Sequence, residues 1–306
     1  KLAVGRCRYG LMLGEDGMGM DDGVTTRLGE THYFMTTTTG GAARVMAWME
    51  DWLQCEWPDL KVFLTSVSEQ WATLSLSGPN ARRLLSELAE GIDLSVQAFP
   101  HMSVRDGRVA GIDARIFRVS FTGELGYEVS VATSYGLALW QAFLRVGENY
   151  DLTPIGTEAL HVLRAEKGYI AVGHDTDGTV TPGDLGMDWI VSTKKDFLGR
   201  RSLARADCVR PDRKHFIGLL PEARVPEGAQ IVDEPRRRPP MKMIGHVTSC
   251  YDSATLGRPI ALAMVAGGRE RMGETVTIPL TMEGRVVKAE IVSPVFYDAQ
   301  GERLNV

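Results

Sequence analysis

The chain has 306 residues, a formal net charge of -5 and an isoelectric point near 5.8, so it is long enough for two domains with complete cores. The acidic balance argues against a nucleic-acid-binding surface, and no apolar run approaches the ~20 residues of a membrane-spanning helix. Cys7, Cys55, Cys208 and Cys250 form no Cys-x-x-Cys pair, which argues against disulfides and a structural zinc site. We expect a cytoplasmic protein with no metal and with neither nucleic acid nor membrane as partner.

Two local features qualify this picture. The chain begins at Lys1 and enters a strand within a few residues, without a targeting segment, which is typical of a fragment of a longer polypeptide. Residues 236–238 are three consecutive arginines in a Pro-rich loop. We expect this run to be solvated or to touch an acidic partner.

Residues 8–28 are predicted to form two strands joined by a Gly-rich hairpin, with Asp21 and Asp22 where the second strand begins. Asp beside Gly is ordinary turn chemistry. Side chains alternate along a strand, however, so one carboxylate can point inward. An inward carboxylate needs a partner, and a ligand nitrogen would supply one.

The chain up to residue 167 is predicted to be α+β, with strand pairs followed by helices. We expect strands at residues 33–39, 62–67, 71–76, 102–104, 114–120 and 127–131, with a turn at 105–107. We expect helices at residues 42–57, 136–146 and 156–167. A further helix is expected to begin after Asn80, which would be its N-terminal cap. Glu128 falls one residue into its strand, where an exposed hairpin glutamate is the simpler interpretation.

The remainder of the chain changes character. Residues 173–201 are rich in loops, and His161 has no partner at metal spacing. Short strands are then expected at residues 216–220, 244–248, 260–265, 275–279 and 286–292, which is typical of a small β-barrel or sandwich. We therefore predict domains at residues 1–208 and 209–306.

Several motifs carry a resemblance to a known family. In chain order they are the Asp-Asp hairpin and residues 76–79, 121–128, 163–169, 181–182 and 245–249. Each is short, but together and in this order they resemble the aminomethyltransferase family, which includes the folate-binding T-protein of the glycine cleavage system. Residues 5–10, 36–39 and 296–303 are most similar to the C-terminal region of sarcosine oxidase alpha subunits.

The resemblance implies a fold and a function. The fold would be a folate-binding domain of antiparallel sheets and helices, N-terminally incomplete, followed by a C-terminal β-barrel. The function would be transfer of a sarcosine-derived imine or formaldehyde unit to tetrahydrofolate, giving 5,10-methylenetetrahydrofolate. Tetrahydrofolate is then a co-substrate, while flavin and NAD belong to partner regions or subunits.

The resemblance also carries site residues. The family's catalytic aspartate maps onto Asp22, and its pterin-binding glutamate maps onto Glu128. A pocket asparagine of the T-protein falls on Thr37, which keeps a hydrogen-bonding group. The further folate-binding candidates are Tyr127, Phe121, Tyr9 and Tyr297.

Other functions stay open at this point. A glycine-cleavage T-protein or a dimethylglycine oxidase domain is an alternative of the same class. A non-catalytic folate-binding protein, such as the iron–sulfur maintenance relatives, would carry a cysteine motif where residues 194–200 have none. A purely structural domain that has lost folate is the third reading, and the presence of both carboxylates argues against it.

Overall fold

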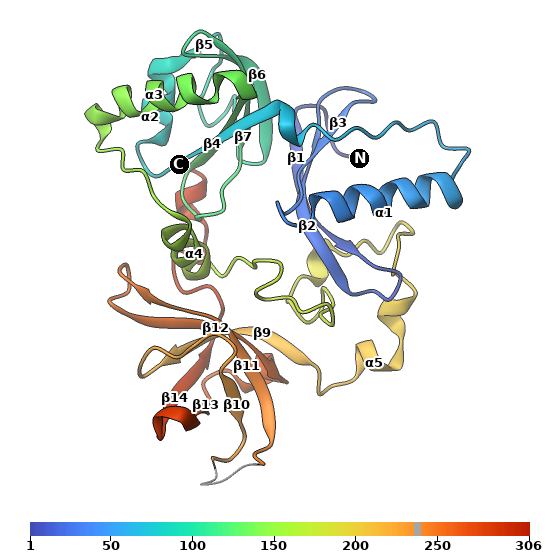
Figure 1. Cartoon of the computed structure of the whole chain (residues 1–306), viewed down its shortest axis with the longest axis vertical. Coiled ribbons are helices and arrows are strands. Elements are labelled where there is room, and N and C mark those ends of the chain that lie inside the picture. Colours follow the sequence, from blue (N-terminus) through green and yellow to red (C-terminus); the bar gives the residue numbers. More distant parts are fainter. Residues whose placement is uncertain (236–239) are drawn as a thin grey trace. The chain divides into compact units, whose positions relative to one another are not determined.

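The computed structural model describes residues 1–235 and 240–306, so the predicted arginine run at 236–238 lies outside the described residues. The chain divides into two compact units (Figure 1). Unit 1 contains Lys1–Gly10, Asp21–Gly156 and Gln300–Val306. Unit 2 contains Leu11–Met20 and Thr157–Ala299.

Unit 1 is built on an antiparallel sheet with the strand order β3-β2-β1-β6-β7-β8-β4, and β5 pairs with β6 beside this path. The strands are β1 Arg6–Leu13, β2 Gly19–Arg27, β3 Tyr33–Met35, β4 Trp71–Ser77, β5 Ala89–Glu90, β6 Ser103–Val109, β7 Ile112–Arg118 and β8 Gly126–Ala132. The helices of this unit are α1 Ala42–Cys55, α2 Ala81–Leu88 and α3 Gly136–Gly147.

The two faces of this sheet have different partners. Tyr127, Val129 and Val131 alternate along β8 and join a core to which α2 and α3 contribute their buried residues. The opposite face carries a smaller cluster around Cys7 and Phe117. Because side chains alternate along β8, Glu128 belongs to the face of the smaller cluster.

The sheet curls so that its two edge strands approach each other. The ring centroid of Phe34 on β3 lies 6.4 Å from that of Trp71 on β4 and 5.6 Å from that of Phe117 on β7. The Arg115 guanidinium lies over both the Phe34 and the Trp71 rings. Side chains rather than backbone hydrogen bonds therefore join β3 to β4, and the smaller cluster lies inside the curl.

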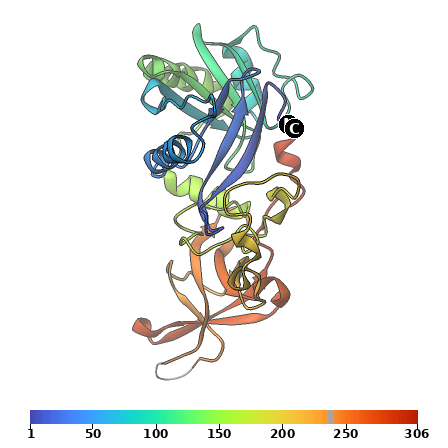
Figure 2. The ribbon, with the colours of Figure 1, turned by 90° about the vertical axis from the view of Figure 1, so that its right-hand side faces the viewer.

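Unit 2 combines α4 Thr157–Glu166 and the short α5 Ala206–Val209 with a closed barrel in the order β10-β11-β12-β9-β14-β13. The barrel strands are β9 Lys214–Pro221, β10 Gln230–Val232, β11 Met243–Ser253, β12 Arg258–Ala266, β13 Thr275–Leu280 and β14 Arg285–Val292. They enclose a core of branched aliphatic side chains, and Figure 2 shows them in orange and red. The predicted α+β fold with a terminal β-barrel is confirmed.

Three charged residues at the end of α4 form what we call the charged hub of unit 2: Arg164, Glu166 and Lys167, all buried. Arg164 donates to Asp175 at 2.6 Å and to Ser249 at 2.5 Å.

The other two members of the hub have partners as well. Ser253 and Thr255 donate to Glu166 at 2.6 and 3.0 Å. Lys167 pairs with Asp298 at 2.8 Å. Arg164 and Glu166 thus tie the end of α4 to β11, and Lys167 ties it to the segment that contains Asp298.

Two sequence predictions about unit 1 strands are wrong. Residues 62–67 form no strand, because β4 takes β8 as its partner, and Phe63 is 96% exposed. The strand predicted at 33–39 ends at Met35. There the loop turns to place Thr38 against the Asp21 carboxylate.

Two turn predictions also need correction. The turn expected at 105–107 lies at Ala110 and Gly111, which both have positive φ, while Gly107 stays inside β6 opposite Ala114. Asn80 does precede α2, but its side chain makes no capping hydrogen bond. Strand β10 was not predicted.

Candidate functional site

The two adjacent aspartates of β2 have different surroundings. Asp21 is 1% exposed and accepts hydrogen bonds from the Thr38 amide, the Thr38 hydroxyl and the Asp22 amide at 3.2, 3.0 and 2.8 Å. A side chain on Gly41 would collide with Asp21, since a Cβ there would lie 1.6 Å from Oδ2. Asp21 therefore holds the loop before α1 against β2.

Asp22 points to the other face of the strand, and its Oδ2 accepts a hydrogen bond from the Tyr9 hydroxyl at 2.8 Å. Burial raises the pKa of the Asp22 carboxyl, the Tyr9 bond partly offsets this, and the Asp21 charge adds to the rise in pKa. Burial and the Asp22 charge raise the pKa of Tyr9 as well. Tyr9 therefore stays a neutral donor to Asp22.

Thr37 follows a very close contact between β2 and the loop after β3. A Cβ on Gly23 would lie 1.8 Å from the Thr36 carbonyl oxygen, so only glycine allows this approach. The Thr37 hydroxyl donates to the Thr38 carbonyl at 2.9 Å. The structure thus places Thr37 close in space to Gly23, the residue that follows Asp22.

Glu128 lies in β8 between two cross-strand neighbours, Phe117 on β7 and Ser75 on β4. Burial raises the pKa of its carboxyl. No side chain within residues 1–235 or 240–306 is recorded as donating a hydrogen bond or forming an ion pair with it. Glu128 is half-buried, and a partly desolvated carboxylate without a donor among the described residues is costly. Glu128 is therefore available to a ligand that carries N–H groups.

Cys7 connects the surroundings of Asp22 and Glu128. Its thiol accepts a hydrogen bond from Thr26 at 3.4 Å. Burial raises the pKa of this thiol, and the Glu128 charge contributes a smaller rise. Cys7 and Tyr9 lie on one face of β1, so Asp22 and Glu128 both face the inside of the curled sheet.

The other predicted folate residues are more dispersed. Tyr127 is fully buried on the opposite face, with its ring centroid 5.8 Å from that of Phe99. Phe121 is 36% exposed in the connection between β7 and β8. Tyr297 belongs to unit 2, where its amide donates to the Glu166 carbonyl at 3.0 Å. Sequence reasoning missed the holding role of Asp21, and no local signal pointed to Thr38 as its partner.

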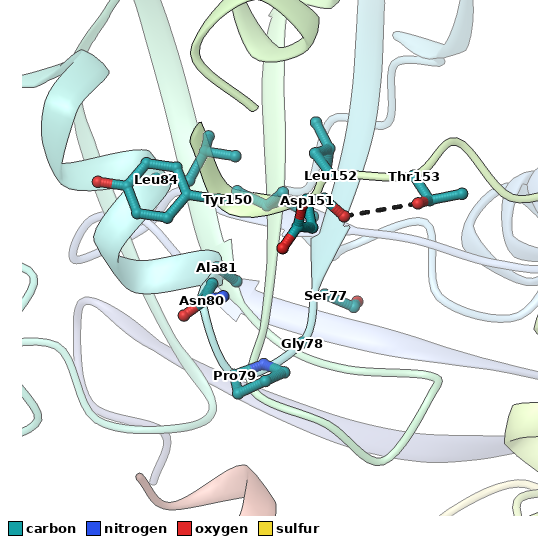
Figure 3. Close-up of a pocket in the computed structure, with 11 residues that line it drawn as sticks. Ser77, Gly78, Pro79, Asn80, Ala81, Leu84, Tyr150, Asp151, Leu152 and Thr153 are labelled. Carbon is teal, nitrogen blue, oxygen red and sulfur yellow. Dashed lines mark hydrogen bonds between the residues drawn. The ribbon is translucent and has the colours of Figure 1, made fainter. Parts of the chain in front are cut away.

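Unit 1 also has a cavity of about 350 Å³ at the start of α2 (Figure 3). It is lined by residues 76–81, Leu84 and residues 150–153. None of the predicted site residues lines it.

The described residues hold no group of three His, Cys, Asp or Glu side chains arranged for a metal ion. Within the same ranges, no helix has the length and apolar character needed to cross a membrane.

Comparison with protein families assigns both parts of the chain. Residues 1–195 match the GCVT N-terminal domain, and residues 214–298 match the glycine cleavage T-protein C-terminal barrel domain. The structure resembles the aminomethyltransferase T of the Bartonella henselae glycine cleavage system, with a TM-score of 0.81 and 24% identity over 97% of this chain and 78% of that one. At this identity the likeness concerns the fold.

Similar sequences fall into two groups. Sarcosine oxidase subunits alpha are 48% identical in Corynebacterium sp. (strain P-1) over 99% of this chain, and 40% identical in Rhizobium meliloti over 100% of it. The chain spans only 32% and 31% of those two proteins. An aminomethyltransferase of Symbiobacterium thermophilum is 33% identical over 99% of this chain and 79% of its own length.

Proposed function

The chain belongs to the glycine cleavage T-protein family of aminomethyltransferases, and from this premise we propose that it is the tetrahydrofolate-binding one-carbon transfer module of a sarcosine oxidase. The observation that carries the proposal is Glu128, a half-buried carboxylate to which no described side chain donates a hydrogen bond. The 48% identity to a sarcosine oxidase subunit alpha supports the choice of parent enzyme.

Glu128 would bind the pterin. Two parallel N–H groups of an aminopyrimidine match the two oxygens of a carboxylate, as the N–H groups of arginine do. Phe117 lies beside Glu128 on the same face of the sheet. Bound ligand would give Glu128 the hydrogen bonds that the described side chains leave unmade.

Asp22 would act on the one-carbon unit. In the proposed reaction the folate amine attacks the carbon of a sarcosine-derived imine, glycine departs as an amine, and 5,10-methylenetetrahydrofolate forms. The Asp22 carboxylate would orient the attacking amine and stabilise the positive charge that develops on it. Tyr9 would hold that carboxylate in place through its 2.8 Å hydrogen bond.

The remaining parts of the proposal follow the parent enzyme. Residues 1–208 would form the folate domain and residues 209–306 the barrel domain, with Thr37 and Phe121 as further candidate folate contacts. Flavin and NAD would be bound by other regions or subunits of the oxidase, which would be the partners of this chain in the cytoplasm. The sarcosine oxidase subunits alpha are about three times as long as the part that this chain matches. This supports placing the flavin and NAD sites outside the chain.

The first experiment is calorimetric titration of the protein with folinic acid, a stable reduced folate. We expect Glu128→Ala to weaken binding by about 1.5–3 kcal/mol, the contribution of a hydrogen bond to a charged group. Glu148→Ala removes an exposed carboxylate of the same unit and should leave the affinity unchanged. Equal affinity in wild type and Glu128→Ala would overturn the assignment of Glu128, and no binding by wild type would favour a structural domain.

A further inference from the structure

Residues 300–306 belong to unit 1, together with residues 21–156. The short helix η8, Glu302–Leu304, lies in this segment. The Arg303 guanidinium donates to both carboxylate oxygens of Glu124, at 3.0 and 3.2 Å. Glu124 lies in the connection between β7 and β8, four residues before Glu128. The segment is therefore fastened to the hairpin that carries the proposed pterin-binding residue.

A second attachment is made by a buried arginine at the end of β7. Arg118 is 1% exposed, and its Nη2 donates to the carbonyls of Leu304 and Val306 at 2.8 and 3.1 Å. Its Nε and Nη1 find no hydrogen-bond partner in the described chain. Residues 304 and 306 thus supply hydrogen bonds to a buried guanidinium, for which unmade hydrogen bonds are strongly unfavourable. Arg82 of α2 also donates to the Val306 carbonyl, at 2.5 Å.

Arg118 in turn contacts the residue next to Glu128. Its guanidinium carbon lies 5.7 Å from the centroid of the Tyr127 ring. Just before β8, the Leu125 carbonyl accepts a hydrogen bond from the Gly78 amide at 2.8 Å. Residues 300–306 thus contact both ends of the β7–β8 connection. They bind Arg118 where β7 ends and Glu124 shortly before β8 begins.

From these contacts we infer that residues 300–306 form a clasp that positions the β7–β8 hairpin, and with it Glu128, for folate binding. Arg118, Glu124 and Arg303 are then positioning residues that act through the hairpin. This inference rests on the proposed function, but the clasp itself can be tested without folate.

The first test is amide hydrogen exchange in the ligand-free protein. Arg303→Gln and Glu124→Gln should each speed exchange of the amides at residues 121–126 several-fold, because opening of the connection becomes easier. The double variant with Glu124→Arg and Arg303→Glu should restore slow exchange. Unchanged exchange in both single variants would overturn the clasp.

The second test is the affinity for folinic acid. Each single variant should raise Kd about two- to fivefold, as expected for the loss of a partly exposed ion pair, and the exchanged pair should restore it. Failure of the exchanged pair to restore affinity while restoring slow exchange would overturn the positioning role. The matched control is Arg285→Gln, which breaks an exposed pair in unit 2 and should change neither measurement.

The two proposals fail in distinguishable ways. If wild type does not bind folinic acid, the proposed function fails, and the exchange data alone decide whether the clasp exists. Arg118→Lys offers a further variant that keeps the charge but can donate to fewer carbonyls at once. The Glu124 and Arg303 variants keep the inference falsifiable even if Arg118→Lys fails to fold.

Discussion

Buried charge is handled in opposite ways in the two units. In the charged hub of unit 2, Arg164, Glu166 and Lys167 each meet protein partners at 3.0 Å or less. Inside the curled sheet of unit 1, half-buried Asp22 has the neutral Tyr9 as its side-chain partner, and half-buried Glu128 has no side-chain donor among the described residues. Both regions hold charge away from bulk solvent, but only in the hub does every charged side chain have close partners.

The difference separates scaffold from site. A charge that has close partners within the protein can hold segments together, and it has less capacity left for a ligand. A partly buried carboxylate without a donor is less stable in the empty protein and gains hydrogen bonds when a ligand supplies them. Residues 163–169 and 121–128 both carried the family resemblance. The first segment contains the charged hub that holds unit 2 together, and the second contains Glu128 of the candidate site.

The largest expected effect comes from breaking the hub. Arg164→Met would leave Asp175 buried without its counter-charge, since both side chains are 0% exposed. Removing one partner of a buried pair costs about 3–5 kcal/mol in the free energy of unfolding. Urea denaturation of the variant and wild type measures this loss.

The matched control is an ion pair with the same short distance but in solvent. Arg285 and Glu283 lie 2.6 Å apart, with 44% and 52% of their side chains exposed. Arg285→Met should cost less than about 1 kcal/mol. Equal losses in the two variants would mean that burial does not distinguish the hub from an ordinary surface pair.

The next largest effect is on catalysis. Asp22→Asn keeps the shape of the side chain but removes the charge that would stabilise the developing cation. We expect one-carbon transfer to fall by about 100-fold or more, measured as methylenetetrahydrofolate formed from sarcosine by the complete oxidase. Folinic acid affinity should change little, and Asp16→Asn in the exposed hairpin turn should change neither. A loss of affinity as large as the loss of rate would contradict the assigned role.

A smaller effect is expected from the partner of Asp22. Tyr9→Phe removes the hydrogen bond that lowers the Asp22 pKa, so the pKa of this carboxyl should rise further. At a given pH a smaller fraction is then ionised, and the acid limb of the pH–rate profile should move to higher pH. We expect about a tenfold loss of rate near that limb. An unshifted limb would show that Asp22 ionisation does not control the rate.

The sequence predicted the elements whose signals are local. The Asp-Asp hairpin, α1, α3 and α4, and five of the six barrel strands were found from turn residues and periodicity. Residues 62–67 failed because β-branched composition fits a strand, but a strand also needs a partner, and β4 pairs with β8 instead. Gly107 failed as a turn because it lies in β6 against Ile92, where a Cβ would come within 2.3 Å of that side chain.

The site was predictable only in part, for a similar reason. Alternation along β2 predicted that one aspartate points inward, but it did not show that Asp21 is held by Thr38, which is seventeen residues away. The roles of Asp22 and Glu128 came from the family resemblance. That Glu128 lies beside Phe117, with no side-chain donor among the described residues, depends on strand register, which no local pattern contains.

The smallest expected effect is a change in how stability depends on pH. Burial raises the pKa of Glu128 in the folded protein above its value in the unfolded chain, so the folded state holds this proton more tightly. The free energy of unfolding then falls as pH rises from the ordinary glutamate pKa through the raised one. Glu128→Gln removes this contribution, so the stability of the variant relative to wild type should increase with pH across that window and stay constant above it.

Urea unfolding of both proteins between about pH 4 and pH 7 measures the difference. The control is Glu148→Gln, which changes an exposed glutamate and should show no pH-dependent difference from wild type. A difference that falls with pH would mean that Glu128 has a cationic partner in the folded protein, and the contrast between the two units would be lost.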